Sequence, residues 1–176
     1  MAGESLIQNP GEIRRVVVES VDAAEAGAGT LARFRASAEL VRNLTVETRA
    51  AGFTIVVDEP ESFAGAGLGP NPLEAMLAGV GSCLAITAVV NAALLGIGIR
   101  SLRIDVQAEV DLAGFYGMTD EPKGFERLVC EVTLETDAGE HEAAELARLA
   151  EARCPGLGAI RLPTPIETRW VINPEG

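Results

Sequence analysis

Histidine and aromatic side chains are scarce in this sequence, and cationic residues are outnumbered. Its 176 residues include one histidine, His141, and only five Phe, one Tyr and one Trp. A single histidine argues against His-rich metal sites and Ser-His triads, and few aromatic rings leave few surfaces for stacking nucleic-acid bases. Asp and Glu outnumber Lys and Arg by 26 to 14, so the net charge of -12 repels phosphate backbones and anionic membranes. We therefore expect no nucleic-acid partner and no membrane partner.

Cysteine is also rare, and its number is odd. The three cysteines cannot form the paired framework of a small secreted protein. The first ten residues have neither the basic start nor the apolar core of a signal peptide. We therefore expect a cytoplasmic protein whose thiols stay reduced unless they carry out redox chemistry. With 48% apolar residues in 18.4 kDa, the chain can bury the core of one domain.

Charged residues are absent from the segment 75–99. That length could cross a bilayer, but glycines, Ser82, Thr87 and Asn91 interrupt the segment, and it has no Trp or Tyr to anchor it at an interface. A helix that is apolar on all sides can equally lie at the centre of a globular fold. We expect the buried helix, and a membrane-embedded subunit remains the weaker alternative.

The rest of the chain is patterned mainly as strands. Alternation from Arg33 to Glu47 predicts a long half-buried strand with Arg42 on its apolar face. Asn71, Pro72 and Glu74 are typical of a helix start, and this helix should end at Gly96. Pro155 should end a later amphipathic helix. The further predicted elements are strands at 13–21, 53–57, 102–112, 125–135 and 166–172, and a helix at 140–153.

This order of elements, without a repeating strand-helix-strand unit, predicts an α+β fold with a mainly antiparallel sheet around a long buried central helix. One sheet in so small a chain can hardly surround an uncharged helix of this length. An intertwined homodimer would bury two such helices back to back, so we expect dimerisation.

Several motifs together resemble those of the OsmC-like superfamily, which includes the organic hydroperoxide resistance proteins. They are Asp58-Glu59-Pro60, the run from Gly69 to Glu74, the run from Ala78 to Cys83, and Ala152-Arg153-Cys154-Pro155. The resemblance extends over residues 36–172. It divides the chain into an N-terminal extension, residues 1–35 (a loose tail at 1–12 and then the candidate strand), and an OsmC-like domain, residues 36–176.

The resemblance implies a thiol-dependent peroxidase that acts on organic hydroperoxides and needs no metal or cofactor. Cys83 would be the peroxidatic residue, and Cys154 would resolve its sulfenic acid as a disulfide that a dithiol reductant reopens. Burial at mid-helix raises a thiol pKa, so a cation must stabilise the thiolate. The family uses an arginine held by a glutamate, and Arg42 and Glu74 are the candidates here.

Each candidate also has a structural interpretation. Glu74 with Asn71 forms a capping-box pattern, and Arg42 could extend from a strand end to solvent. Cys130 is expected to be a core residue, and His141 to be solvated. In the hydroperoxide-resistance branch the acid lies ten residues before the cysteine, where this chain has Leu73. This departure resembles the less characterised OsmC-like branch, and it favours an alternative function: binding of a hydrophobic small molecule, or redox sensing, without efficient peroxidase activity.

Overall fold

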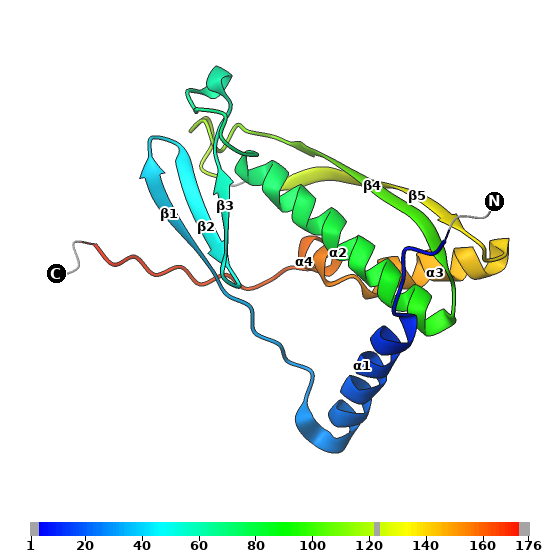
Figure 1. Cartoon of the computed structure of the whole chain (residues 1–176). Coiled ribbons are helices and arrows are strands. Elements are labelled where there is room, and N and C mark those ends of the chain that lie inside the picture. The colour runs from blue at the N-terminus through cyan, green and yellow to red at the C-terminus, as the bar shows by residue number, and fades with distance from the viewer. Residues whose placement is uncertain (1–3, 122–123, 173–176) are drawn as a thin grey trace.

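Two antiparallel sheets and four α-helices make up the described part of the chain (Figure 1). The computed structural model describes residues 4–121 and 124–172. In chain order the elements are α1 (Pro10–Ala23), η1 (Ala24–Ala28), β1 (Ala36–Arg42), β2 (Thr45–Ala50), β3 (Phe53–Val57), η2 (Glu61–Phe63), α2 (Pro72–Leu95), β4 (Ile99–Val110), β5 (Phe125–Thr136), α3 (Glu140–Arg153) and α4 (Pro155–Arg161). The predicted α+β class with antiparallel sheets is confirmed.

The central helix α2 begins and ends where the sequence predicts. The Asn71 side chain accepts a hydrogen bond from the Glu74 amide at 2.9 Å, and the Glu74 carboxylate accepts one from the Asn71 amide at 2.9 Å. This reciprocal pair satisfies two of the backbone donors that a helix start leaves free. At the other end Gly96 takes a left-handed conformation with φ of 74°, which costs glycine little and stops the helix.

The strands form two separate sheets. One sheet has the order β1-β2-β3, and the other is the long β4-β5 hairpin, in which Leu102 pairs with Leu134 and Val106 with Cys130. Helix α2 lies along the hairpin so closely that a Cβ added at Gly81 would meet Cγ2 of Val106 at 3.1 Å. Figure 1 shows the β1–β3 sheet near one end of α2 and α1 near the other.

Two buried clusters hold α2 in place. The first joins α2 to α3 and α4, and its members are Val80, Leu84, Ala88, Ala150, Cys154 and Leu157. The second lies toward the C-terminal end of α2, and its members are Ile7, Ala92, Ile97, Ile99 and Leu146. Both clusters consist of aliphatic side chains and one cysteine, as expected from a sequence with so few aromatic residues.

The structure corrects the prediction for the N-terminal extension. The tail expected at 1–12 is not loose at residues 5–7: the Leu6 amide donates to the Ile99 carbonyl at 2.6 Å, and Ile7 is 8% exposed. Residues 1–3 lie outside the described residues. The strand predicted at 13–21 is helix α1, which starts with Pro10 in its first turn. Ile13 and Val17, four residues apart, face α2, and this spacing outweighs the strand preference of β-branched residues.

Two further strand predictions are wrong. The strand expected from Arg33 to Glu47 is a hairpin, because Asn43 has φ of 49° and turns the chain between β1 and β2. Asn tolerates this left-handed conformation better than most residues do. The segment 166–172 is extended and exposed, and it pairs with no strand in the described chain.

Pro155 ends α3 at Arg153 as predicted, but it also begins a helix that the sequence prediction missed. Proline fits the first helical position because its missing N–H needs no partner there. The result is a sharp junction at Cys154, whose backbone is extended (φ -73°, ψ 113°) between α3 and α4.

One side of α2 is left uncovered by its own chain. Among the described residues, α2 is the one helix long and apolar enough to cross a membrane. Here it packs against β4, α3, α4 and α1, as a core helix does. On the opposite side, however, Met76 is 50% and Ile86 65% exposed, so the predicted burial is complete only on the side that faces the hairpin and α3.

A buried carboxylate, Asp58, organises the loop between β3 and α2. It is 1% exposed, and it accepts hydrogen bonds from the amides of Glu59, Ala66 and Leu68 and from the Thr45 hydroxyl. Burial by itself would raise the pKa of Asp58, but these donors favour the ionised form and leave the pKa below its ordinary value. The ionised Asp58 therefore fixes the loop that leads into α2.

We predict that Asp58→Asn lowers the melting temperature at pH 7 and flattens its dependence on acid pH. Because the pKa of Asp58 is lower in the folded chain than in the unfolded one, its stabilisation is present above the unfolded pKa and is lost as the pH falls through the folded pKa. The difference between wild type and variant should therefore shrink below about pH 4. Thermal unfolding between pH 2.5 and 7 measures it.

The matched control is Asp22→Asn, because Asp22 is exposed on α1. It should change the melting temperature by little at any pH. Equal melting temperatures for wild type and Asp58→Asn at pH 7 would show that the carboxylate does not organise the loop.

Candidate active site

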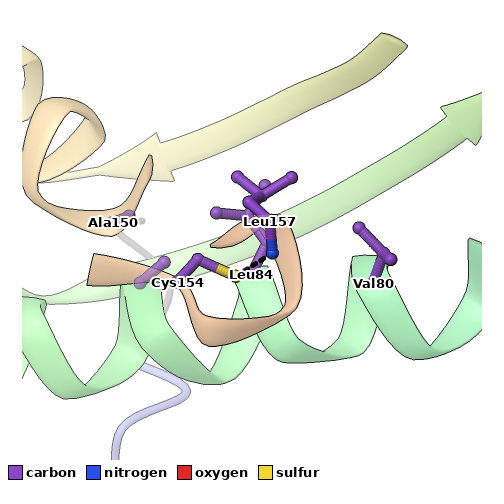
Figure 2. Close-up of a cluster of buried hydrophobic side chains, with 6 residues drawn as sticks. Val80, Leu84, Ala150, Cys154 and Leu157 are labelled. Carbon is purple, nitrogen blue, oxygen red and sulfur yellow. Dashed lines mark hydrogen bonds between the residues drawn. The ribbon is translucent and has the colours of Figure 1, made fainter. Parts of the chain in front are cut away.

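Two cysteines that lie 71 positions apart in the sequence come together beside α2. Cys83 is half-buried near the middle of α2, and Cys154 is 4% exposed at the junction of α3 and α4. Both pack in the first buried cluster, where Cys154 is a member and Cys83 lies against it. Figure 2 shows Cys154 directly over α2. The structure thus brings the two predicted redox residues into one site.

Backbone amides from the start of α4 are directed at both sulfur atoms. The Gly156 amide donates to Cys83 Sγ at 3.3 Å, and the Leu157 amide donates to Cys154 Sγ at 3.5 Å; Figure 2 shows the second contact as a dashed line. These N–H groups belong to the first turn of a helix and have no partner within it. A thiolate accepts such a bond more strongly than a thiol does.

The pKa of Cys83 reflects opposing influences. Burial raises it most, the Gly156 amide lowers it, the neighbouring Cys154 raises it, and the Thr87 hydroxyl lowers it. The balance is a pKa above the ordinary cysteine value. The site of a single chain therefore favours the thiol, and it needs further positive charge to supply a thiolate at neutral pH.

A buried polar chain connects the helix that carries Cys83 to the residue before Cys154. Asn91, 2% exposed on α2, accepts a hydrogen bond from Arg153 Nη1 at 2.7 Å and donates one to the Thr87 carbonyl at 2.7 Å. The Thr87 hydroxyl donates to the Cys83 carbonyl at 2.8 Å. Because a buried amide is costly without partners, these bonds fix the end of α3 against α2.

Arg42 and Glu74, the other two predicted site residues, are not at the cysteines. Arg42 is exposed at the end of β1, and the Glu74 carboxylate is used in the capping box of α2. Among the described residues of one chain, no hydrogen bond or ion pair joins either side chain to Cys83. The capping interpretation of Glu74 is confirmed, and a role for Arg42 depends on what lies beyond this single chain.

Sequence reasoning missed the residues that surround the thiols. Gly156 lies so close that an added Cβ would be 2.9 Å from Cys83 Cβ and 3.2 Å from its sulfur. The signal was present in Cys154-Pro155-Gly156, because proline after a cysteine can begin a helix as well as end one. His141 is exposed as predicted. No group of three metal-ligating side chains occurs within residues 4–121 and 124–172.

The fold and site define a class: an α+β protein with one cysteine on an uncharged central helix and a second at the start of a later helix. The family model described as OsmC-like protein matches residues 65–169, and the chain belongs to this family. The family prediction made from the motifs is confirmed.

Solved structures agree with this assignment at the level of the fold. An OsmC-like protein from Mycoplasma pneumoniae superposes with a TM-score of 0.66 at 22% identity, over 75% of this chain and 89% of that one. An organic hydroperoxide resistance protein OsmC from Legionella pneumophila gives 0.58 at 20% identity, over 75% and 91%. An organic hydroperoxide resistance protein from Elizabethkingia anophelis superposes with a TM-score of 0.58 at 18% identity, over 75% of this chain and 90% of that one. A search of curated proteins found no match.

We predict that Gly156→Ala makes Cys83 less reactive. The added methyl group would lie 2.9 Å from Cys83 Cβ, so the start of α4 must move and the amide bond to the sulfur must lengthen or break. Hydrogen bonds to charged groups are worth about 1.5–3 kcal/mol, so alkylation at pH 7 should slow about tenfold or more. The rate of Cys83 alkylation by iodoacetamide, followed by peptide mapping at a series of pH values, measures this change.

Gly158→Ala provides the matched control on the same helix, because a Cβ at Gly158 meets nothing within 4 Å. Its pH profile should overlay that of the wild type. If Gly156→Ala also overlays the wild type while remaining folded, the amide does not control the thiolate.

Proposed function

We propose that this protein is a two-cysteine peroxidase that reduces organic hydroperoxides. The Cys83 thiolate attacks the terminal oxygen of the O–O bond, which releases the alkoxide and leaves Cys83 as sulfenic acid. The alkoxide takes a proton to become the alcohol. The Cys154 thiolate then attacks Cys83 Sγ and a disulfide forms, while the sulfenic oxygen leaves as hydroxide and takes up a proton to become water. A dithiol reductant reopens the disulfide and becomes oxidised in turn.

The observation that carries this proposal is that Cys83 and Cys154 both lie beside Gly156, whose amide donates to Cys83 Sγ. A structural core cysteine needs neither a second thiol nor a directed N–H donor. The apolar surroundings of Cys83 favour the organic part of an alkyl hydroperoxide over hydrogen peroxide. Reversible disulfide chemistry of this kind suits a reducing compartment, which supports a cytoplasmic location.

We further propose that the active enzyme is a homodimer. The open side of α2, with Ile86 65% exposed, and Leu40, Val41 and Phe53 on the β1–β3 sheet give one chain an apolar surface that water disfavours. Arg42 ends a strand of this uncovered sheet. In an intertwined dimer Arg42 of one chain could supply the positive charge that Cys83 of the other lacks.

A second candidate function, binding of a hydrophobic small molecule, has one observation in its favour. A cavity of about 740 Å³ lies at the start of α2, within the range of small-molecule sites. Its aromatic side is made by Phe63, Phe115 and Tyr116, whose neighbouring ring centroids lie 5.9 and 5.6 Å apart. The engagement of Glu74 in the capping box also fits a protein without an Arg–Glu network at the thiol.

We predict that Cys83→Ser abolishes consumption of cumene hydroperoxide in the presence of a dithiol. Serine has almost the same size but no nucleophilic thiolate, so the first step is lost while the fold is kept. Xylenol-orange assays of remaining peroxide measure the rate, with Cys83→Ser compared with wild type. Equal rates in both proteins would exclude the proposed mechanism.

The companion variant Cys154→Ser should be oxidised once at Cys83 and then stop, because its sulfenic acid has no resolving thiol. Trapping with dimedone and mass spectrometry detect that intermediate. Slow peroxide loss in the wild type, together with an apolar ligand retained in native mass spectra, would favour the binding function instead.

We predict that the wild type sediments at twice its 18.4 kDa chain mass and that Ile86→Glu shifts it toward the monomer. A carboxylate there would be buried without a partner if two α2 helices pack together. The control is Val18→Glu, because Val18 is 45% exposed on α1 and the change should leave the mass unaltered. Sedimentation velocity measures both. A dimer that survives Ile86→Glu would place the interface elsewhere.

A further inference from the structure

The third cysteine, Cys130, belongs to the same cluster as the proposed redox pair. It lies on β5 opposite Val106 of β4, and its half-buried side chain packs against the cluster that contains Cys154 and Leu157. The sequence predicted that Cys130 would be a core residue, and the structure adds that it packs against the cluster that contains a second cysteine. All three thiols of the chain therefore belong to this one cluster or pack against it.

Cys154 is the neighbour that the other two cysteines share. Its charge raises the pKa of both Cys83 and Cys130. Cys83 and Cys130 thus both pack against the cluster in which Cys154 is a buried member.

Cys130 and Cys154 differ in their surroundings. Cys130 lines a surface cavity of about 340 Å³, together with Leu157, Ile160, Glu151 and Arg161. Burial raises the pKa of Cys130, and the positive charge of Arg161 opposes that rise. Cys154 itself is 4% exposed, so a dithiol from solvent reaches the cavity more easily than it reaches Cys154.

We propose that Cys130 is a second resolving thiol. It displaces Cys83 from the Cys83–Cys154 disulfide, so that the new disulfide lies at the cavity beside Arg161. This inference rests on the peroxidase function proposed above. The Cys130 thiolate attacks Cys154 Sγ, a Cys130–Cys154 bond forms, and Cys83 leaves as a thiolate. One disulfide replaces another, so the step needs no further oxidant or reductant.

The backbone at Cys154 suits this transfer. Cys154 is extended between two helices, and a 3.5 Å contact from the Leu157 amide holds its sulfur. The proposed transfer requires Cys154 to leave this contact by a change of its side-chain rotamer. After transfer, Cys83 is free to react with a second hydroperoxide before any reductant arrives.

Peptide mapping of the full-length protein can follow the transfer, because trypsin places the three cysteines on separate peptides, 50–100, 128–148 and 154–161. Reduced wild type is mixed with one equivalent of cumene hydroperoxide, quenched at intervals with acid and N-ethylmaleimide, and mapped without reduction. The linked pair 50–100/154–161 should form first and then give way to 128–148/154–161. A second equivalent should then oxidise Cys83 to a dimedone-reactive sulfenic acid.

Cys130→Ser is the comparison variant. It should stop at the Cys83–Cys154 disulfide and consume about one equivalent without reductant, against about two for the wild type. If the wild type forms Cys83–Cys154 and never Cys130–Cys154, the second resolving role is overturned while the peroxidase proposal stands. If Cys83–Cys154 does not form either, the peroxidase proposal fails and the transfer fails with it.

Cys83→Ser tests the pairing without peroxide chemistry. Treated with oxidised glutathione, the folded variant should form Cys130–Cys154 as its main product. If only mixed disulfides with glutathione accumulate, Cys130 and Cys154 cannot meet and the inference is overturned, whatever the fate of hydroperoxide in the wild type.

Discussion

The structure depends on covering a 24-residue helix that carries no charge beyond its first turn. Water disfavours every side of α2, so the other elements are arranged to shield it. The β4-β5 hairpin covers one side, α3 and α4 cover a second, and residues 5–7 with α1 cover the C-terminal end. Its polar side chains bond back along the helix, as Thr87 does to the Cys83 carbonyl. The charged capping box at Asn71 marks where this apolar segment starts.

The peroxidatic role proposed for Cys83 meets an electrostatic difficulty on such a helix. Cys83 is remote from both helix ends, and burial opposes its ionisation. The chain meets part of this difficulty locally, by starting α4 against α2 so that the Gly156 amide reaches the sulfur. Only glycine permits that approach, since any Cβ would overlap Cys83. The Arg153–Asn91 bond holds the preceding helix in place. The segment from Cys154 to Gly156 therefore places both the second thiol and the Gly156 amide beside Cys83.

The sequence was informative where one physical signal dominated. Capping residues and an uncharged run defined α2, strict alternation defined β4, and a proline stop defined the end of α3. It failed where signals competed. Consecutive valines in α1 suggested a strand, although the spacing of Ile13 and Val17 favoured a helix against α2. The turn at Asn43 was hidden in a long alternating pattern. Pro155 could have indicated the helix that begins there, but the role of Gly156 comes from its contact with a residue 73 positions away, which no local pattern records.

The proposed catalysis and the proposed dimer respond to the same shortage. The elements of one chain cover only part of the surface of α2. The same chain places no cationic side chain of its described residues in contact with Cys83 to favour the thiolate. Its β1–β3 sheet has exposed apolar side chains, and β1 ends with Arg42. Among the described residues, no hydrogen bond or ion pair joins Arg42 to a thiol of its own chain. A second chain placed against the open side of α2 would remove apolar surface from water and bring a cation toward a buried sulfur. Burial strengthens that attraction. In the proposed dimer, the apolar surface that one chain leaves uncovered would therefore also be the one that brings positive charge to Cys83.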